Sequence, residues 1–170
     1  MLEFKVRGLA ELERALNELP VKLAANVVRG GLRAAAKVVE AEAETLVPNR
    51  TGELRESIRV SSRLRRGVPE ASVKAGGKVK GKRVAFYAHM VEKGTEPHEI
   101  RPKGAKSLFL AGVNRTLVNH PGAQAKRFLQ RAADQRRAEA VEAFKNHCSK
   151  RLAREGVNVP DPEPETPEGE

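Results

Sequence analysis

The segment Val21–Pro48, VKLAANVVRGGLRAAAKVVEAEAETLVP, decides the architecture expected for this chain. Its apolar residues recur at steps of three and four, which is the spacing of one face of an α-helix. That face consists of Val28, Leu32, Ala35, Val39, Ala43 and Leu46. Pro48 ends the segment, because proline lacks the amide hydrogen that a helix interior needs. We therefore expect one long helix over about residues 21–46, with one face against a core.

Two adjacent glycines, Gly30 and Gly31, lie inside this predicted helix. A glycine in a helix interior costs about 1 kcal/mol relative to alanine. Two such costs in a row indicate that the missing side chains serve a purpose. The pair predicts either a kink or the close contact of a second helix.

Two more helices are expected, one on each side of this segment. A shorter one precedes Pro20, where leucines stand at helical spacing: Leu9, Leu12, Leu16 and Leu19. A second long helix is expected from about Gly122 to Arg154, with an apolar stripe of Leu129, Ala132, Ala133, Ala140, Phe144, Cys148 and Leu152. Cys148 is the single cysteine, so no disulfide can form within the chain, and we expect it to be a small packing residue.

Short apolar runs predict β-strands in the remaining segments. They cover residues 2–7, about 58–64, 69–77, 83–95 and 107–111. Residues 86–91, FYAHMV, are apolar on both alternating faces, which is typical of a central strand covered on both sides. The segment GGKVKGKR, residues 76–83, is expected to be a basic hairpin tip. This order predicts an α+β fold, with an antiparallel sheet of about four to five strands packed against two long helices.

The C-terminal segment differs in composition from the rest. Residues 155–170 hold six acidic residues and four prolines, and no lysine or arginine. Such a segment buries too little apolar surface to offset the entropy of ordering it. We therefore predict a single α+β domain over residues 1–154, followed by a flexible acidic tail over 155–170.

The body of the chain is strongly basic. The whole sequence has a net charge of +10, but without the six acids of the tail, residues 1–154 carry 16 acidic against 32 basic residues, or +16. This charge favours nucleic acid or an acidic protein surface as the partner. The sequence has one Tyr, five Phe and no Trp, which argues against an aromatic platform for single strands. No apolar run approaches the roughly 20 residues of a membrane-spanning helix, and no membrane partner is expected.

Polar residues between Phe86 and Phe109 raise the question of a reactive centre. They are His89, Glu92, Glu96, His98 and Glu99. A zinc site needs three or four ligands in a fitting geometry, and the chain has no CxxC or HExxH motif. Carboxylates spread along a loop do not indicate the single cleft that acid–base catalysis needs, and Ser107 lacks a G-x-S-x-G context. We expect no enzymatic activity, no metal and no cofactor.

The same stretch carries short motifs in a defined order. They are Tyr87-Ala88, Val91-Glu92 with Gly94-Thr95, His98/Ile100/Pro102-Lys103/Ala105-Lys106/Leu108, and His120-Pro121-Gly122 with Phe128-Leu129 and Ala132. Earlier positions complete the series: Gly8, Leu12, Leu16, Leu19-Pro20, Pro48, Thr51-Gly52, Leu54 and Ser57-Ile58. Over about residues 5–145 the chain thereby resembles the neck or tail-completion proteins of lambdoid siphophages, also described as head–tail joining or minor tail proteins. One position departs from the pattern, since Arg127 stands where that family often has proline.

The resemblance implies a structural protein of the virion, assembled in the host cytoplasm. It implies a homo-oligomeric ring in the neck between the head connector and the tail, with a hexamer favoured over a dodecamer. The neighbours would be connector or stopper, tail-terminator and tail-tube proteins, and DNA would pass through the lumen. The basic composition leaves an alternative open, namely a nucleic-acid-binding module that acts on phage DNA.

Two groups of residues are candidates for a subunit or partner interface. They are Lys78, Lys80, Lys82 and Arg83 on the predicted hairpin, and His98, Arg101, Lys103 and Lys106 in the loop after it. Gly52, Gly94 and Gly122 suit tight turns, while Pro102 and Pro121 stiffen the connections. A loop stiffened in this way can hold a fixed shape against a neighbouring subunit, which suits a ring component better than a catalyst.

Overall fold

The structure is a computed structural model of the chain, and it describes residues 8–17, 19–48, 52–79, 82–104, 106–110 and 112–157. For residues 78, 79 and 82–84 it describes the backbone alone. The strand predicted at residues 2–7 and the part of the predicted tail after residue 157 lie outside the described residues. The chain divides into two compact units.

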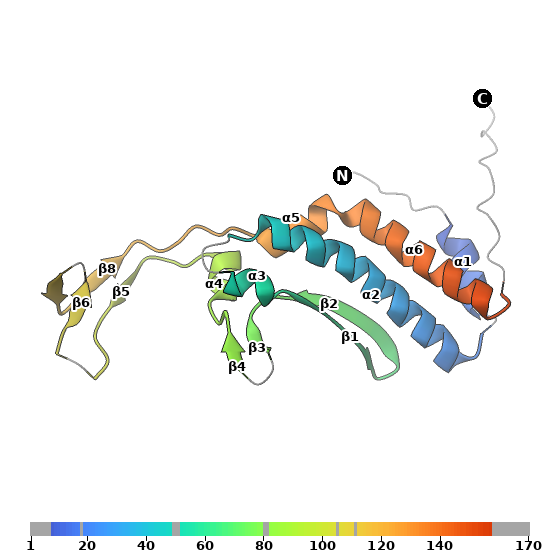
Figure 1. Cartoon of the computed structure of the whole chain (residues 1–170), viewed down its shortest axis with the longest axis horizontal. Helices are drawn as coiled ribbons and strands as arrows, with labels where there is room; N and C mark the ends of the chain where they lie inside the picture. Colours follow the sequence, from blue (N-terminus) through green and yellow to red (C-terminus); the bar gives the residue numbers. More distant parts are fainter. Residues whose placement is uncertain are drawn as a thin grey trace, which may run out of the picture. The chain divides into compact units, whose positions relative to one another are not determined.

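Unit 1 comprises residues 1–46, 58–74 and 129–170. Its helices are α1 (Leu9–Asn17), α2 (Val21–Leu46), most of α5 (Phe128–Gln135) and α6 (Arg137–Arg154). Strands β1 (Arg59–Arg65) and β2 (Val68–Lys74) pair antiparallel, from Arg59 opposite Lys74 to Arg65 opposite Val68. Figure 1 shows α2 and α6 side by side, with the β1–β2 hairpin along α2. The long helix predicted at 21–46 is confirmed, and so is the strand predicted near 58–64.

The two glycines of α2 mark a point where α6 comes very close. A Cβ atom added at Gly31 would lie 2.6 Å from the Cys148 sulfur and 2.8 Å from the Phe144 ring. A Cβ atom added at Gly30 would meet the imidazole of His147. Both glycines lie within the single helix α2. Of the two alternatives that the sequence left open, the close contact of a second helix is therefore confirmed.

Unit 1 has an apolar core to which α1, α2 and α6 contribute. It consists of Leu12, Ala15, Val27, Cys148 and Leu152, and Leu16, Leu19, Phe144 and Val157 pack against it. Fully burying a Val or Leu side chain stabilises the fold by roughly 1.5–3 kcal/mol. Cys148 is fully buried, as predicted for a packing residue. Because burial disfavours the charged thiolate, it raises the pKa of this thiol to about 11.

The C-terminal helical region is interrupted at Arg136, between α5 and α6. The guanidinium of Arg136 donates to the carboxylates of Glu42 in α2, at 2.7 Å, and Glu139 in α6, at 2.8 Å. The hydrogen bond to Glu42 first, and then the one to Glu139, raises the pKa of Arg136 above its ordinary value. The prediction of one helix starting near Gly122 is wrong, because the chain stays extended until Phe128 and breaks at this anchored arginine.

Unit 2 comprises residues 47–57 and 75–128. It contains two short helices, α3 (Glu53–Glu56) and α4 (Ala88–Lys93). Its strands are β3 (Gly77–Val79), β4 (Lys82–Val84), β5 (His98–Ile100), β6 (Leu108–Leu110), β7 (Val113–Arg115) and β8 (Val118–His120). Pairing of β3 with β4 confirms the predicted basic hairpin, although its two tip residues, 80 and 81, lie outside the described residues. Strand β6 confirms the short strand predicted near 107–111.

The prediction of one sheet with about four to five strands is wrong. Within the described residues the strands form four separate antiparallel pairs: β1–β2, β3–β4, β5–β8 and β6–β7. Three of these pairs are only three residues long, so each strand offers few backbone groups to a further neighbour. Residues with positive φ also turn the chain between pairs, among them Gly76 at 73° and Gly104 at 79°. The mixture of helices and strands still agrees with the predicted α+β class.

Residues 86–91, predicted as a central strand, instead form a turn and the start of α4. Ala85 has a φ of 44°, and its carbonyl accepts a hydrogen bond from the Ala88 amide, which turns the chain out of β4. The helix then closes with the bond from the Gly94 amide to the Met90 carbonyl at 2.8 Å. The strand prediction is wrong because a short apolar run is compatible with either structure.

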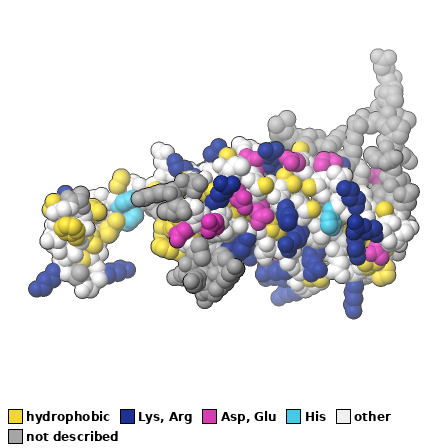
Figure 2. Space-filling model, viewed as in Figure 1, with side chains coloured by type: hydrophobic (Ala, Val, Ile, Leu, Met, Phe, Trp, Pro, Cys, Tyr) yellow, Lys and Arg dark blue, Asp and Glu magenta, His cyan; other side chains and the backbone are white. Residues whose placement is uncertain are grey.

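The surface agrees with the basic composition. Figure 2 shows Lys and Arg side chains spread over the visible face of unit 1, with Asp and Glu side chains among them. Across the described ranges, no helix combines the length and the apolar character that crossing a membrane requires.

The helix contact predicts different outcomes for two neighbouring substitutions. Gly31→Ala overpacks against Cys148 and Phe144, which costs about 1–3 kcal/mol. Gly30→Ala adds the same methyl group against the exposed side chain of His147, which can rotate away. Both variants gain about 1 kcal/mol of helix propensity, so Gly31→Ala should be at least about 1 kcal/mol less stable than Gly30→Ala. Urea unfolding followed by circular dichroism measures the difference, and equal stabilities would contradict the contact.

Burial should also make Cys148 slow to react. A thiol pKa of about 11 leaves little thiolate at pH 8, and the sulfur is covered by the core. In 6 M guanidinium chloride the thiol regains its ordinary pKa, so alkylation by iodoacetamide should be about 100-fold faster or more. Mass spectrometry of timed samples at pH 8 measures both rates. A folded-state rate close to the unfolded one would mean that the α2–α6 core opens readily.

Candidate interaction site of unit 2

Residues 95–123, apart from 105 and 111, form a long antiparallel hairpin that pairs at three successive levels and is termed the arm. Thr95 and Ala123 bridge at its base, β5 pairs with β8 in the middle, and β6 pairs with β7 farthest from the base in sequence. Figure 1 shows the two chain segments running together through β5 and β8 toward β6. Residues 108–110 and 112–115 are termed the arm tip. Within the described residues, the strands of the arm pair only with each other and join no larger sheet.

Two glycines let the segments meet at the base of the arm. The amides of Thr95 and Ala123 each donate to the carbonyl of the other residue, at 2.9 and 3.0 Å. Gly94 has a φ of 77° and Gly122 one of 85°, values that other residues rarely adopt. A Cβ atom at Gly94 would lie 2.6 Å from the Ala123 carbonyl oxygen, and one at Gly122 would meet the carbonyl oxygen of Thr95. At Gly94 and Gly122 the base of the arm therefore has no room for a side chain.

Two histidines face each other in the middle of the arm. His98 and His120 are register partners, and their rings stack with centroids 5.0 Å apart. Nδ1 of His120 accepts a hydrogen bond from the Gly122 amide at 3.0 Å. Nδ1 of His98 lies 2.9 Å from the Glu96 carbonyl, which can only accept, so here the ring donates. The ring stacking therefore joins β5 to β8, while each hydrogen bond ties its histidine to the segment on its own side of the base.

The arm tip exposes large apolar side chains. Phe109 is 74% exposed, and Leu110 and Val113 are each 52% exposed. Leu110 and Val113 are register partners and share one face of the hairpin, while Phe109 points to the other face. Figure 2 shows hydrophobic side chains together at this end of the arm, with basic side chains near them. A cluster of exposed large apolar side chains is typical of a surface that binds another protein.

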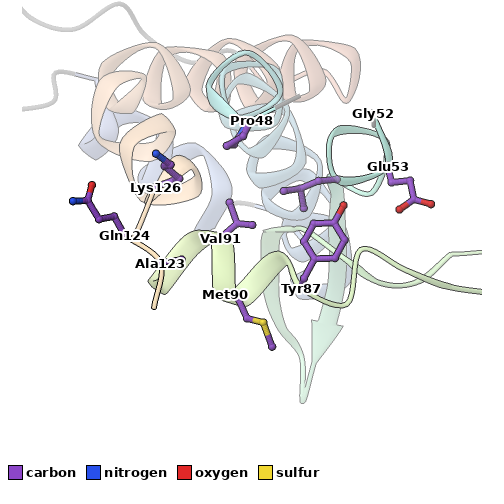
Figure 3. Close-up of a pocket in the computed structure, with 10 residues that line it drawn as sticks. Pro48, Gly52, Glu53, Tyr87, Met90, Val91, Ala123, Gln124 and Lys126 are labelled. Carbon is purple, nitrogen blue, oxygen red and sulfur yellow. The ribbon is translucent and has the colours of Figure 1, made fainter. Parts of the chain in front are cut away.

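A groove of about 630 Å³ lies in unit 2 beside the base of the arm. Its lining residues are Pro48, Gly52, Glu53, Leu54, Tyr87, Met90, Val91, Ala123, Gln124 and Lys126. Figure 3 shows Pro48, Tyr87 and Val91 around its centre, with Glu53 and Lys126 at opposite edges. Clefts that bind ligands or side chains typically have about 300–1,000 Å³, so the groove is large enough for an occupant.

One wall of the groove forms where the returning segment of the arm passes the end of α4. The last carbonyls of a helix lack partners within it. Here the carbonyls of Val91 and Glu92 accept hydrogen bonds from the amides of Lys126, at 2.9 Å, and Arg127, at 3.1 Å. Arg127 has a φ of 48°, and proline could supply neither this angle nor the amide hydrogen. The departure from the resembled family at Arg127 therefore has a backbone role.

A buried serine joins the two segments of unit 2. The Ser57 hydroxyl donates to the Leu54 carbonyl at 2.6 Å and accepts from the Gly76 amide at 2.8 Å. Leu54 is itself buried and lines the groove. This bond connects α3 to the start of β3, and it explains why a small hydroxyl residue stands at Ser57.

The predicted interface residues lie on two parts of unit 2. Lys78, Lys82 and Arg83 lie in β3 and β4, where only the backbone is described, and Lys80 lies outside the described residues. Arg101, Lys103 and Lys106 are exposed in the arm between β5 and β6, and Arg101 pairs with Glu99 at 2.9 Å. Pro102 lies in the same stretch, and Pro121 directly precedes the turn at Gly122. A role of these residues in an interface stays a prediction.

Sequence reasoning missed the apolar part of the site. Leu108–Leu110 was expected as an ordinary strand, and its apolar letters do not show whether anything covers them. The groove draws its lining from three segments, and several of its residues are also motif positions in the sequence, such as Pro48, Leu54 and Tyr87. The sequence does not show that these motif positions lie around one groove, because they lie in segments that are far apart along the chain.

The polar residues first considered for catalysis do not converge. In the part of the chain that the structure describes, no three His, Cys, Asp or Glu side chains come together as a metal site would require. His89 is exposed on α4, and its ring contacts the Phe86 carbonyl at 3.0 Å. His98, Glu96 and Glu99 lie in the arm.

An exposed apolar arm tip and an open groove are typical of a protein that assembles with other proteins. The chain belongs to the HK97-gp10-like family, described as "Bacteriophage HK97-gp10, putative tail-component", which matches residues 10–94. The match spans α1 to α4 and ends directly before the arm. No curated protein and no solved structure matches the chain. The family is that of a structural component of the phage tail, so the resemblance to tail-region proteins is confirmed.

The base of the arm predicts a local effect of one glycine substitution. Gly94→Ala should break the Thr95–Ala123 bridge, because the new Cβ would lie 2.6 Å from the Ala123 carbonyl oxygen. Gly104→Ala is the matched control, since Gly104 also has a positive φ, 79°, but no atom within 4 Å of the added Cβ. Hydrogen exchange of the Thr95 and Ala123 amides should become about tenfold faster or more in Gly94→Ala only. Equal protection in both variants would contradict the close approach.

Proposed function

We propose that the protein is a structural subunit of the phage neck that completes the tail and joins it to the head. The observation that carries this proposal is the arm with its exposed apolar tip, found on a member of a family of phage tail components. A side chain such as Phe109 is unfavourable in water, so an exposed group of them suits a protein that is completed by its neighbours.

In this proposal the subunits form a closed homo-oligomeric ring, and a hexamer matches the symmetry of a tail. The arm and the groove are different surfaces, so contact between them is heterologous, and heterologous contacts that close by rotation generate rings. The ring would lie between the connector or stopper proteins of the head and the terminator or tube proteins of the tail. Its assembly would take place in the host cytoplasm and its final location would be the virion.

The charge of the chain supports a ring through which DNA passes. Residues 1–154 have a net charge of +16, and basic side chains extend from unit 1 to the arm. A positive lumen would attract the phosphate backbone without reading its sequence. In this role the protein carries out no chemical reaction, and the basic hairpin of Lys78, Lys80, Lys82 and Arg83 would face either the lumen or a neighbouring subunit.

The same charge supports a second candidate function, a module that binds phage DNA without forming a ring. Such a protein would bind duplex DNA as a monomer, and its affinity would fall steeply with salt because each phosphate contact releases counterions. Ring formation distinguishes the two candidate functions, since only the first requires it. The exposed apolar arm tip favours the first candidate, because it has no role in a purely electrostatic complex with DNA.

Particles assembled without this protein test the proposed function. If the subunit joins tail to head, electron microscopy should show full heads and finished tails that are separate, and restoring the protein should restore joined particles. A map of the neck should show a closed ring of this chain. Joined particles in its absence would overturn the proposal. A single copy or a two-fold dimer in the neck would overturn the ring, and salt-sensitive DNA binding by a monomer would then favour the second candidate.

A further inference from the structure

We propose that the arm tip of one copy docks into the groove of a second copy, with Phe109 as the apolar anchor. This inference rests on the proposed ring and deepens it, because it names the contact between neighbouring subunits. The two surfaces belong to the same unit of the chain, one at the base of the arm and the other at its tip.

The tip and the groove match in chemistry. Phe109 is the most exposed of the large apolar side chains at the tip, at 74%. An aromatic side chain can bury about 150–250 Å² when it enters an apolar site, and such residues commonly anchor interfaces. The groove offers Leu54, Tyr87, Met90 and Val91 as apolar lining. Docking would therefore bury the exposed Phe109 ring and the exposed apolar lining of the groove at the same time.

The arm does not fill its own groove. Phe109 remains exposed, whereas Ala123 at the base of the same arm lines the groove. The Thr95–Ala123 bridge and the β5–β8 pair keep the two segments of the arm together from its base outward. A return of the tip to its own base would require a reversal of the hairpin between β5 and β6. Docking into another copy requires no such change.

Charged residues beside the two surfaces favour one orientation. Arg115 is exposed at the tip and is the register partner of Leu108, while Glu53 is exposed at one edge of the groove. Lys126 stands at the opposite edge in Figure 3. Opposite charges attract and like charges repel across an interface, so Arg115 should approach the Glu53 edge. A tip-to-groove contact is heterologous, or head-to-tail. Each copy can therefore dock its own arm tip into one neighbour and bind the arm tip of another neighbour in its groove.

A single contact between an arm tip and a groove should be weak, whereas a closed ring of such contacts should be stable. One hairpin tip buries much less than the roughly 1,600 Å² of a standard stable interface. In a ring every subunit is held on two sides, so opening one contact does not release it. The contact therefore suits assembly that becomes stable only when the ring closes.

The test places one cysteine on each surface of the full-length chain. Asn114, the register partner of Phe109, and Gln124, in the groove lining, are both exposed, so Asn114→Cys and Gln124→Cys should leave the fold unchanged. Mild oxidation of the double variant, both purified and in assembled particles, should give a ladder of covalent multimers. Each single variant is the control and can give no product larger than a dimer, because Cys148 is buried.

Two further changes in the same background test the anchor and the charge pair. Phe109→Ser should reduce the ladder about tenfold or more without changing the melting temperature, because an exposed anchor contributes to binding and not to the fold. Glu53→Arg should reduce it too, and Arg115→Glu added to Glu53→Arg should restore it.

Each outcome bears on one proposal or the other. An intramolecular disulfide in the double variant, or no ladder in either purified protein or particles, overturns arm-to-groove docking. If closed rings still form in particles with Phe109→Ser, docking is wrong and the ring proposal stands. If no ring forms even with the unaltered chain, it is the proposed function that fails.

Discussion

The close approach of α2 and α6 at Gly31 is the constraint on which unit 1 depends. No side chain fits there, because the Cys148 sulfur and the Phe144 ring occupy the space that a Cβ atom would need. With the helices this close, Val27, Cys148 and Leu152 become fully buried and α1 completes the core through Leu12. Close packing of this kind explains how a chain with few aromatic residues still forms a dense interior.

In unit 2, glycines also allow a close approach, but here two backbone segments meet instead of two helices with their side chains. Gly94 and Gly122 allow Thr95 and Ala123 to exchange two hydrogen bonds, and the arm begins at that bridge. The segment that returns from the arm then supplies amide donors to the end of α4. The wall of the groove and the base of the arm are thus parts of one hydrogen-bonded arrangement, which makes the position of the groove depend on the arm.

In the proposed function, the exposed apolar tip and the basic body would act at different stages of assembly. Charge acts over roughly 8 Å at physiological salt and can guide partners or DNA toward the protein. Apolar contact acts only once surfaces meet, and it sets how long they stay together. A subunit that joins others in the phage tail region benefits from both. The family match covers α1, α2 and the chain as far as α4, and it ends directly before the arm.

The sequence by itself determined the long helix, the basic hairpin and the family, because each rests on local spacing or on short motifs. It left open whether the two glycines mark a kink or a helix contact, and the structure decided for the contact. The sequence also indicated the buried Cys148 from its place in an apolar stripe. Only the tertiary structure decided that residues 86–91 form a turn and α4, since an apolar run has the same letters in a strand and in a short helix. It also decided that the strands stay in separate pairs, and that Phe109 is exposed while Leu54 lines a groove. Exposure and grooves arise from what packs around a residue, and that information lies in contacts between distant segments of the chain.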